Sequence, residues 1–250
     1  MSKQAHVIAV YSLKGGVGKT SLAVNLAAEA ALQAGGRTLL WDLDGQAAAS
    51  FILGHDGPGK RTAEQVFDRD VAPAKLVTPT AIEGLDLLPA DTSLRGLDAL
   101  FLDAGKKKRL ARLLADIGAD YDRIILDCPP GLTETSEQMM RAADLIVVPV
   151  IPSPLSRRAL DEVIAHLRPA KKNSTPLMPV YAMVDARRAL HRDALAAETA
   201  WPVLPMASIV EQMAARRRPL AAYARRSKAG QAYAALWLRV AALLGVRKPG

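Results

Sequence analysis

Ser12-Leu-Lys-Gly-Gly-Val-Gly-Lys-Thr20 is the segment of this chain that indicates its architecture most clearly. It follows the short run His6-Val-Ile-Ala-Val-Tyr11, whose apolar, β-branched character predicts a buried strand. It precedes Ser21–Ala34, where apolar residues recur at helical spacing until Gly35-Gly36. A strand, a glycine-rich loop and a helix in this order are the context in which a loop binds phosphate.

The residue types of this loop suit that role. Its glycines let backbone N–H groups turn inward without a clashing Cβ and form an anion nest. The helix that begins near Ser21 adds unpaired N–H donors and the positive end of its dipole. Lys19 is expected to reach the β- and γ-phosphates of a nucleotide, and the Thr20 hydroxyl to ligate Mg²⁺. An ordinary glycine turn is the alternative, and Gly-Lys-Thr at a helix start argues against it.

Strands and helices alternate along the rest of the chain. We expect further strands at Thr38–Asp42, Leu85–Pro89, Arg123–Asp127, Leu145–Pro149, Pro179–Val184 and Val203–Met206. We expect further helices at Ser93–Asp103, Lys106–Ile117, Thr133–Ala142, Leu155–Leu167, Ala189–Thr199, Ser208–Arg217 and Lys228–Leu244. This alternation predicts an α/β fold with a single doubly wound, mostly parallel sheet and helices on both faces. Gly54–Pro79 is the least regular part, and no linker divides residues 1–250, so we expect one domain.

Two of the expected strands end in aspartates. Asp42-Leu-Asp44 ends one, and Asp127 ends the other. Ligands of a doubly wound sheet gather at the carboxyl ends of its strands, so both groups are expected to face the phosphate loop. Asp127, behind an apolar strand, is the expected partner of Mg²⁺ through its water shell. The alternative for each aspartate is a turn or a helix cap.

The loop departs from the standard phosphate loop in one respect. Leu13 stands where a glycine is usual, and a second lysine, Lys14, stands at the loop entrance. This Lys-Gly-Gly-Val-Gly-Lys-Thr string resembles the ParA/MinD family of P-loop ATPases. The resemblance implies that Lys14 reaches the nucleotide of a partner subunit, so that two chains sandwich two ATP molecules. The alternative is a solvated surface lysine. Further resemblance lies in Tyr121–Pro130, Ala143–Pro149 and Val184–Arg187.

The resemblance also assigns the acidic segment. It matches the family's Asp-x-Asp-Pro-Gln switch, which implies that Asp44 orients the attacking water while Asp42 secures the strand end. Gly45 replaces the proline, and since glycine loosens a loop, a regulator with little turnover stays open as a possibility. The family's adenine pocket maps to Asp185 and Pro205.

The expected nucleotide site has three overlapping sets of residues. The catalytic residues are Lys14, Lys19 and Asp44. The nucleotide contacts are Lys14, Gly15, Gly16, Val17, Gly18, Lys19, Thr20, Ser21, Asp185 and Pro205. The Mg²⁺ residues are Thr20, Asp44 and Asp127. The expected cofactors are therefore ATP and Mg²⁺.

The charge of the chain points to a further partner. The formal net charge is +8, which favours polyanions. Cys128 is the one cysteine, which excludes an internal disulfide framework and fits a reducing compartment. The polar start of the chain has no signal-peptide pattern, so we expect a cytoplasmic, nucleoid-associated protein.

Positive charge concentrates between Arg187 and Lys228, where nine basic and three acidic residues leave +6. The string Arg218–Lys228 resembles the DNA-contacting segment of partition ATPases. We therefore expect non-specific DNA binding by phosphate contacts, in an ATP-bound homodimer whose slow hydrolysis an adaptor protein stimulates. The cargo would be a plasmid, a chromosome or a protein assembly such as a carboxysome. The expected DNA contacts are Arg187, Arg188, Arg216, Arg217, Arg218, Arg225, Arg226 and Lys228.

Two alternatives to DNA binding stay open. The basic residues can form a solvated face without a partner. Alternatively, Ala232–Val246 can form an amphipathic helix on a membrane surface, as in MinD-like ATPases. The apolar residues of that stretch are Tyr233, Leu236, Trp237, Val240, Leu243 and Leu244, with Arg239 and Arg247 alongside. Packing of this stripe as the last helix on the sheet is favoured over membrane binding.

Overall fold

The computed structural model describes residues 5–57, 61–68, 71–102, 109–167 and 175–246. They form an eight-stranded sheet in the order β3-β4-β2-β5-β1-β6-β7-β8. All strand pairs are parallel except β3 with β4. The strands are β1 His6–Val10, β2 Thr38–Asp42, β3 Thr78–Pro79, β4 Leu85–Leu88, β5 Arg123–Asp127, β6 Leu145–Val150, β7 Leu177–Val184 and β8 Val203–Pro205.

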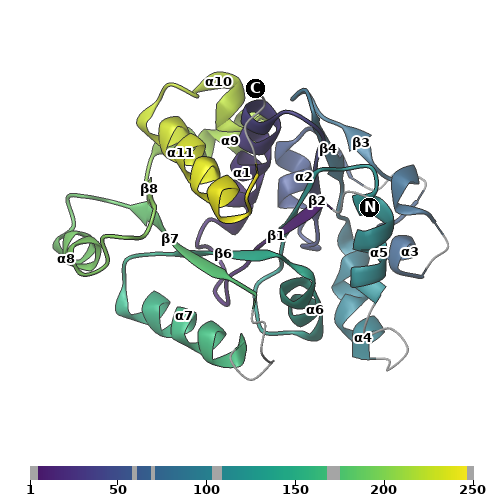
Figure 1. Cartoon of the computed structure of the whole chain (residues 1–250), viewed down its shortest axis with the longest axis horizontal. Helices are drawn as coiled ribbons and strands as arrows, with labels where there is room; N and C mark the ends of the chain where they lie inside the picture. The colour runs from purple at the N-terminus through teal and green to yellow at the C-terminus, as the bar shows by residue number, and fades with distance from the viewer. Residues whose placement is uncertain (1–4, 58–60, 69–70, 103–108, 168–174, 247–250) are drawn as a thin grey trace.

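Apolar side chains leave the central strands in both directions and create two cores. In β1, Val7 and Ala9 join one core, whereas Ile8 and Val10 join the other. A strand that is buried on both faces needs apolar residues at nearly every position, which explains the composition of these segments. Figure 1 shows helices above and below the sheet, and this confirms the predicted fold class.

One core is covered by helices from both ends of the chain. These helices are α1 Lys19–Ala34, α2 Ala48–Ile52, α9 Ser208–Arg216, α10 Leu220–Tyr223 and α11 Lys228–Leu243. The other core is covered by α3 Glu64–Asp68, α4 Leu97–Leu102, α5 Arg109–Gly118, α6 Glu134–Ala142 and α7 Pro154–Leu167. The remaining elements are α8 Ala189–Ala197 and the 3₁₀ helices η1 Pro73–Lys75 and η2 Thr92–Gly96.

The sequence prediction missed several short elements. Outside Gly54–Pro79 these are α2 and α10, of five and four residues. The segment predicted to be irregular, Gly54–Pro79, contains α3, η1 and β3. The predicted helix boundaries at Asp103 and Lys106 lie outside the described residues. No helix in the described part of the chain has the length and hydropathy of a membrane span.

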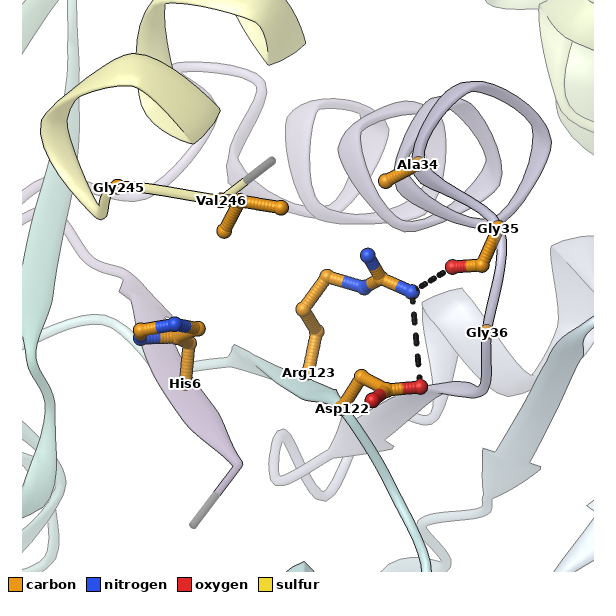
Figure 2. A pocket seen from close by; sticks show the side chains of 8 residues that line it. All are labelled: His6, Ala34, Gly35, Gly36, Asp122, Arg123, Gly245 and Val246. Carbon is orange, nitrogen blue, oxygen red and sulfur yellow. Dashed lines mark hydrogen bonds and ion pairs between the residues drawn. The ribbon is translucent and has the colours of Figure 1, made fainter. Parts of the chain in front are cut away.

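A buried arginine joins the amino ends of the strands to the end of α1. Arg123, the first residue of β5, is 3 % exposed, and its guanidinium donates to the Gly35 carbonyl and to Thr38 Oγ1 at 3.2 Å. The ring of Trp237 on α11 lies 5.9 Å from the guanidinium carbon. A pocket of about 430 Å³ lies at this edge, and Arg123 is one of the residues that line it (Figure 2). We interpret Arg123 as structural, since its partners are parts of the fold.

Candidate nucleotide site

The phosphate loop connects the carboxyl end of β1 to the first turn of α1. Gly16 and Gly18 have φ of 72° and 86°, a left-handed conformation that residues with a β-carbon rarely adopt. Gly18 is the N-cap of α1, and its carbonyl accepts from the Leu22 amide at 2.9 Å. A β-carbon placed at either glycine would meet no protein atom within 4 Å. The loop is therefore shaped by its glycines around open space, as a phosphate cradle requires.

Lys19 is folded inward over this loop. The side chain is buried, and its Nζ donates to the Lys14 carbonyl at 3.2 Å. Burial lowers the pKa of the Lys19 ammonium, while the nearby Asp127 and Asp44 carboxylates counteract part of this shift. Within the described part of the chain, this carbonyl is the one hydrogen-bond partner of the buried ammonium, which therefore has donors left for phosphate oxygens.

Two carboxylates meet at the ends of neighbouring strands. Asp42 of β2 and Asp127 of β5 are register partners, and both are fully buried. Asp42 accepts hydrogen bonds from Ser50 N at 2.8 Å, Ser50 Oγ at 2.7 Å and Asp44 N at 3.2 Å. Burial raises the pKa of Asp42 to about 6 even though these donors favour its charged form. Asp42 thus secures the strand end and the start of α2, as expected.

Asp127 differs from Asp42 in its surroundings. Neither of its carboxylate oxygens has a hydrogen-bond partner of good geometry among the described residues. Burial, and then the Asp42 charge, raise the pKa of Asp127 well above its usual range, and the neighbouring Thr20 hydroxyl lowers it in part. Unpaired buried oxygens beside a hydroxyl are suited to hydrated Mg²⁺, which prefers a few oxygen ligands and retains waters. Asp127 and Thr20 therefore fit a magnesium ion.

Asp44 lies half-buried in the turn between β2 and α2. Its Oδ1 accepts from the Gln46 amide at 2.9 Å, and its carbonyl accepts from the Ala47 amide at 2.8 Å. Its charge lies close enough to Lys19 to raise the pKa of that ammonium. The carboxylate is therefore at the phosphate loop, on a turn rather than on the strand.

The expectation that Gly45 loosens this turn needs a correction. Gly45 is packed against η2, and a β-carbon there would lie 3.0 Å from Arg95 Cγ and 3.4 Å from the Arg95 amide nitrogen. Its φ is not positive, so the backbone conformation does not demand glycine. Contact with η2 therefore accounts for a small residue here. The turn and η2 line a cleft of about 670 Å³ that also includes Asp44, Gln46 and Pro130.

Lys14 and the expected adenine residues lie at the same edge of the sheet. The Lys14 amide donates to Ser12 Oγ at 3.3 Å, and no described residue forms an ion pair with its half-exposed side chain. Asp185 follows β7, and Pro205, the last residue of β8, stands beside Val184. The Asp185 carboxylate is bound by Arg187, which lowers its pKa to about 2. The roles of these residues stay predictions.

The expected DNA contacts fall into two groups. Arg187 and Arg188 precede α8, which Figure 1 shows at the left edge, whereas α9 and α10 lie at the top. We call residues Arg216–Lys228 the basic segment, which contains six basic and no acidic residues. Arg218, Arg226 and Lys228 are exposed, and no described residue forms an ion pair with them. The single basic face predicted from the sequence is thus divided.

The apolar stripe of α11 mostly faces the protein. Tyr233, Leu236, Trp237 and Val240 are buried in the core that α11 shares with α1. Only the end of the stripe, at Leu243, is widely exposed, at 63 %. Arg247 lies outside the described residues. The side chains that a membrane-surface helix would offer are therefore already used in packing.

A parallel sheet, a glycine nest with a buried lysine, and unpaired carboxylate oxygens beside it define a P-loop nucleoside triphosphatase. The AAA domain family AAA_31 matches residues 5–179. The chain belongs to the ParA/MinD family of P-loop ATPases.

Three known proteins illustrate this relationship. The sporulation initiation inhibitor protein Soj of Bacillus subtilis is 32 % identical over 94 % of this chain and 98 % of its own. The chromosome partitioning protein ParA of Caulobacter vibrioides (strain NA1000 / CB15N) is 32 % identical over 71 % of this chain and 68 % of its own. A cobyrinic acid a,c-diamide synthase of Mycobacterium smegmatis, solved with ADP and magnesium, is 30 % identical, with a TM-score of 0.77 and 98 % of each chain covered. The three proteins have different names, so the comparisons support the family and the fold but do not identify a cargo.

Proposed function

We propose that this chain hydrolyses ATP with Mg²⁺, dimerises on ATP, and binds duplex DNA without sequence preference as the ATP-bound dimer. One observation carries the DNA-binding part: six basic residues fall within the basic segment, and Arg218, Arg226 and Lys228 are exposed without ion-pair partners among the described residues. Such cations suit phosphate contacts. The name of the Caulobacter relative supports a role in partitioning.

The site residues suggest how hydrolysis would proceed. Lys19 would exchange the Lys14 carbonyl for phosphate oxygens, since that carbonyl is the one hydrogen-bond partner of its ammonium among the described residues. Asp127 and Thr20 would hold Mg²⁺, which supplies charge neutralisation on the phosphates. Asp44 would orient the attacking water, and Lys14 of one subunit would add positive charge at the nucleotide of the other. A cation supplied from a second subunit makes hydrolysis depend on dimer closure.

Dimerisation would convert nucleotide binding into DNA binding. Two basic segments on one dimer add their phosphate contacts, so the dimer binds far more tightly than a monomer. Slow hydrolysis, stimulated by an adaptor protein, would then open the dimer and release DNA. In the cytoplasm, on the nucleoid, such a cycle would segregate or position a plasmid, a chromosome or a protein assembly.

Binding of a labelled random duplex to the purified chain tests the proposal. We expect much tighter binding with ATP and Mg²⁺ than with ADP or without nucleotide, and weaker binding as salt increases. Equal affinity in all three nucleotide states would contradict the switch. Light scattering in the same three states measures the dimer independently of DNA.

A further inference from the structure

A polar stripe that is buried at its centre runs along α1, the helix that begins at the phosphate loop. Ser21, Asn25, Glu29 and Gln33 are spaced four residues apart and therefore lie on one face of the helix. Asn25 is 1 % exposed and Glu29 is 2 % exposed, although most of the helix is apolar. Buried polar groups need partners, and here the partners come from the C-terminal part of the chain.

Asn25 attaches the start of the basic segment to α1. Its Oδ1 accepts from the Leu220 amide at 2.9 Å, and its Nδ2 donates to the Ser21 carbonyl at 2.7 Å and to Met213 Sδ at 3.1 Å. Met213 belongs to α9 and Leu220 to α10. One side chain on the phosphate-loop helix therefore holds the helices on both sides of Arg216–Arg218.

Glu29 attaches the end of the basic segment. Arg225 Nη2 donates to Glu29 Oε2 at 3.1 Å, and Gln33 Nε2 donates to the same oxygen at 2.6 Å. The Glu29 side chain is 2 % exposed, so the Arg225 guanidinium is directed toward a carboxylate that DNA could not reach. Arg226, the next residue, is exposed and has no such partner among the described residues. Adjacent arginines thus have different surroundings.

A second inward arginine attaches the basic segment to α2. Arg217 Nε donates to the Phe51 carbonyl at 3.1 Å, the guanidinium lies 4.7 Å from the Phe51 ring centre, and Nη1 pairs with Asp56 at 2.5 Å. Helix α2 directly follows the Asp44 turn and is tied to Asp42 through Ser50. The basic segment therefore contacts α1, which carries Lys19 and Thr20, and α2, which follows the turn that carries Asp44.

We propose that Arg225 and Arg217 are positioning residues that couple the basic segment to the phosphate-loop helix and to α2, rather than phosphate contacts of DNA. Nucleotide that binds at the loop and at the Asp44 turn restricts the motion of α1 and α2. Because Arg225 and Arg217 bind these helices, the basic segment is restricted with them. Coupling between two sites commonly changes affinity by about 5- to 150-fold. The inference rests on the proposed DNA binding, but it also predicts an effect that needs no DNA.

The test compares the neighbours Arg225 and Arg226. The measured quantity is the ratio of DNA dissociation constants without nucleotide and with a non-hydrolysable ATP analogue and Mg²⁺. Arg225→Gln and Glu29→Gln should each lower this ratio about fivefold or more. The double variant should lower it no further, because both changes break one link. Arg226→Gln should weaken binding by the same factor in both states and leave the ratio unchanged.

Arg158→Gln is the matched control, since Arg158 is a 79 % exposed residue on α7, at the opposite face of the sheet from α10 in Figure 1. It should change neither affinity nor ratio. The inference is wrong if Arg225→Gln behaves like Arg226→Gln while Glu29→Gln keeps the wild-type ratio. Arg225 is 46 % exposed, so Arg225→Gln and Arg225→Lys carry the test if Glu29→Gln does not fold.

Amide hydrogen exchange tests the same coupling in the absence of DNA. In the wild type, ADP with Mg²⁺ should slow exchange at the phosphate loop and also at residues 213–228, which include the Leu220 amide. Arg225→Gln should lose the slowing at 213–228 and keep it at the loop. Slowing at the loop alone in the wild type would overturn the inference. If no nucleotide state binds DNA, the proposed function fails and this measurement alone decides the inference.

Discussion

Replacing Asp127 with asparagine should stabilise the nucleotide-free protein while removing its response to magnesium nucleotide. Asp127 is fully buried, lies beside Asp42, and has two oxygens without hydrogen-bond partners of good geometry among the described residues. An unpaired buried polar group costs about 1–3 kcal/mol, and more when it is charged. Asparagine removes the charge at nearly constant volume, so we expect a gain of about 2 kcal/mol in the free energy of unfolding at pH 8.

The pH dependence of this gain follows from the raised pKa of Asp127. An acid whose folded pKa is raised stabilises the protein when it is protonated, and that contribution is lost as the pH rises through the folded pKa. The wild type should therefore recover stability as the pH falls below the raised folded pKa toward the ordinary pKa of a carboxyl group, and the advantage of the asparagine variant should be smaller at pH 5 than at pH 8. Asp42, with a pKa of about 6, contributes in the same direction in both proteins.

Urea unfolding with a chelator present, at both pH values, measures the effect. Saturating ATP and Mg²⁺ at a hundred times the dissociation constant should add about 2.7 kcal/mol to the wild type and far less to the variant. Asp161→Asn, at a 58 % exposed carboxylate, is the control and should stay within about 0.5 kcal/mol of the wild type. A variant less stable than the wild type at pH 8 without nucleotide would refute the reasoning.

Three further predictions test other parts of the structure. Lys14→Gln should keep the nucleotide affinity of the monomer in calorimetry but lose the ATP-dependent dimer in light scattering; an intact dimer would remove Lys14 from the interface. Gly45→Ala should cost about 1 kcal/mol in urea unfolding and under half of that when Arg95 is also alanine, because the new β-carbon meets Arg95 Cγ at 3.0 Å; equal costs in both backgrounds would contradict this contact. Phe67→Ala should cost about 3–5 kcal/mol, since its ring lies 5.7 Å from that of Trp41 in a buried stack; a loss under about 1 kcal/mol would show that the cavity collapses.

The sequence was informative wherever a pattern is local. The loop, α1 and the apolar strands follow from glycine spacing and short β-branched runs, and the structure has them within a few residues of the predicted bounds. Helix α2 was missed because five residues are too few to show a period. Strand β3 was missed because it consists of Thr78 and Pro79 only, paired antiparallel with β4.

The sequence could not show contacts between distant segments. Asn25 and Glu29 are polar residues in a helix, yet they are buried because their partners lie 195 and 196 residues further along the chain. Arg225 was predicted to contact DNA because the sequence shows its charge. The sequence does not show its ion pair with Glu29. The prediction that Gly45 loosens its turn used only the conformational freedom of glycine. The contact between Gly45 and Arg95 depends instead on where η2 packs.

The polar stripe on α1 bears on how chimeric proteins should be built from members of this family. The segment from α9 to the end of α11 is continuous in the sequence, which makes it an obvious unit to exchange. Its fit, however, depends on Asn25 and Glu29, which lie near the other end of the chain. A graft that brings a new C-terminal segment without its matching α1 residues would leave a buried carboxylate or amide unpaired, at about 1–3 kcal/mol for each group. The unit that can be transplanted is therefore discontinuous, and it includes the helix that holds the nucleotide.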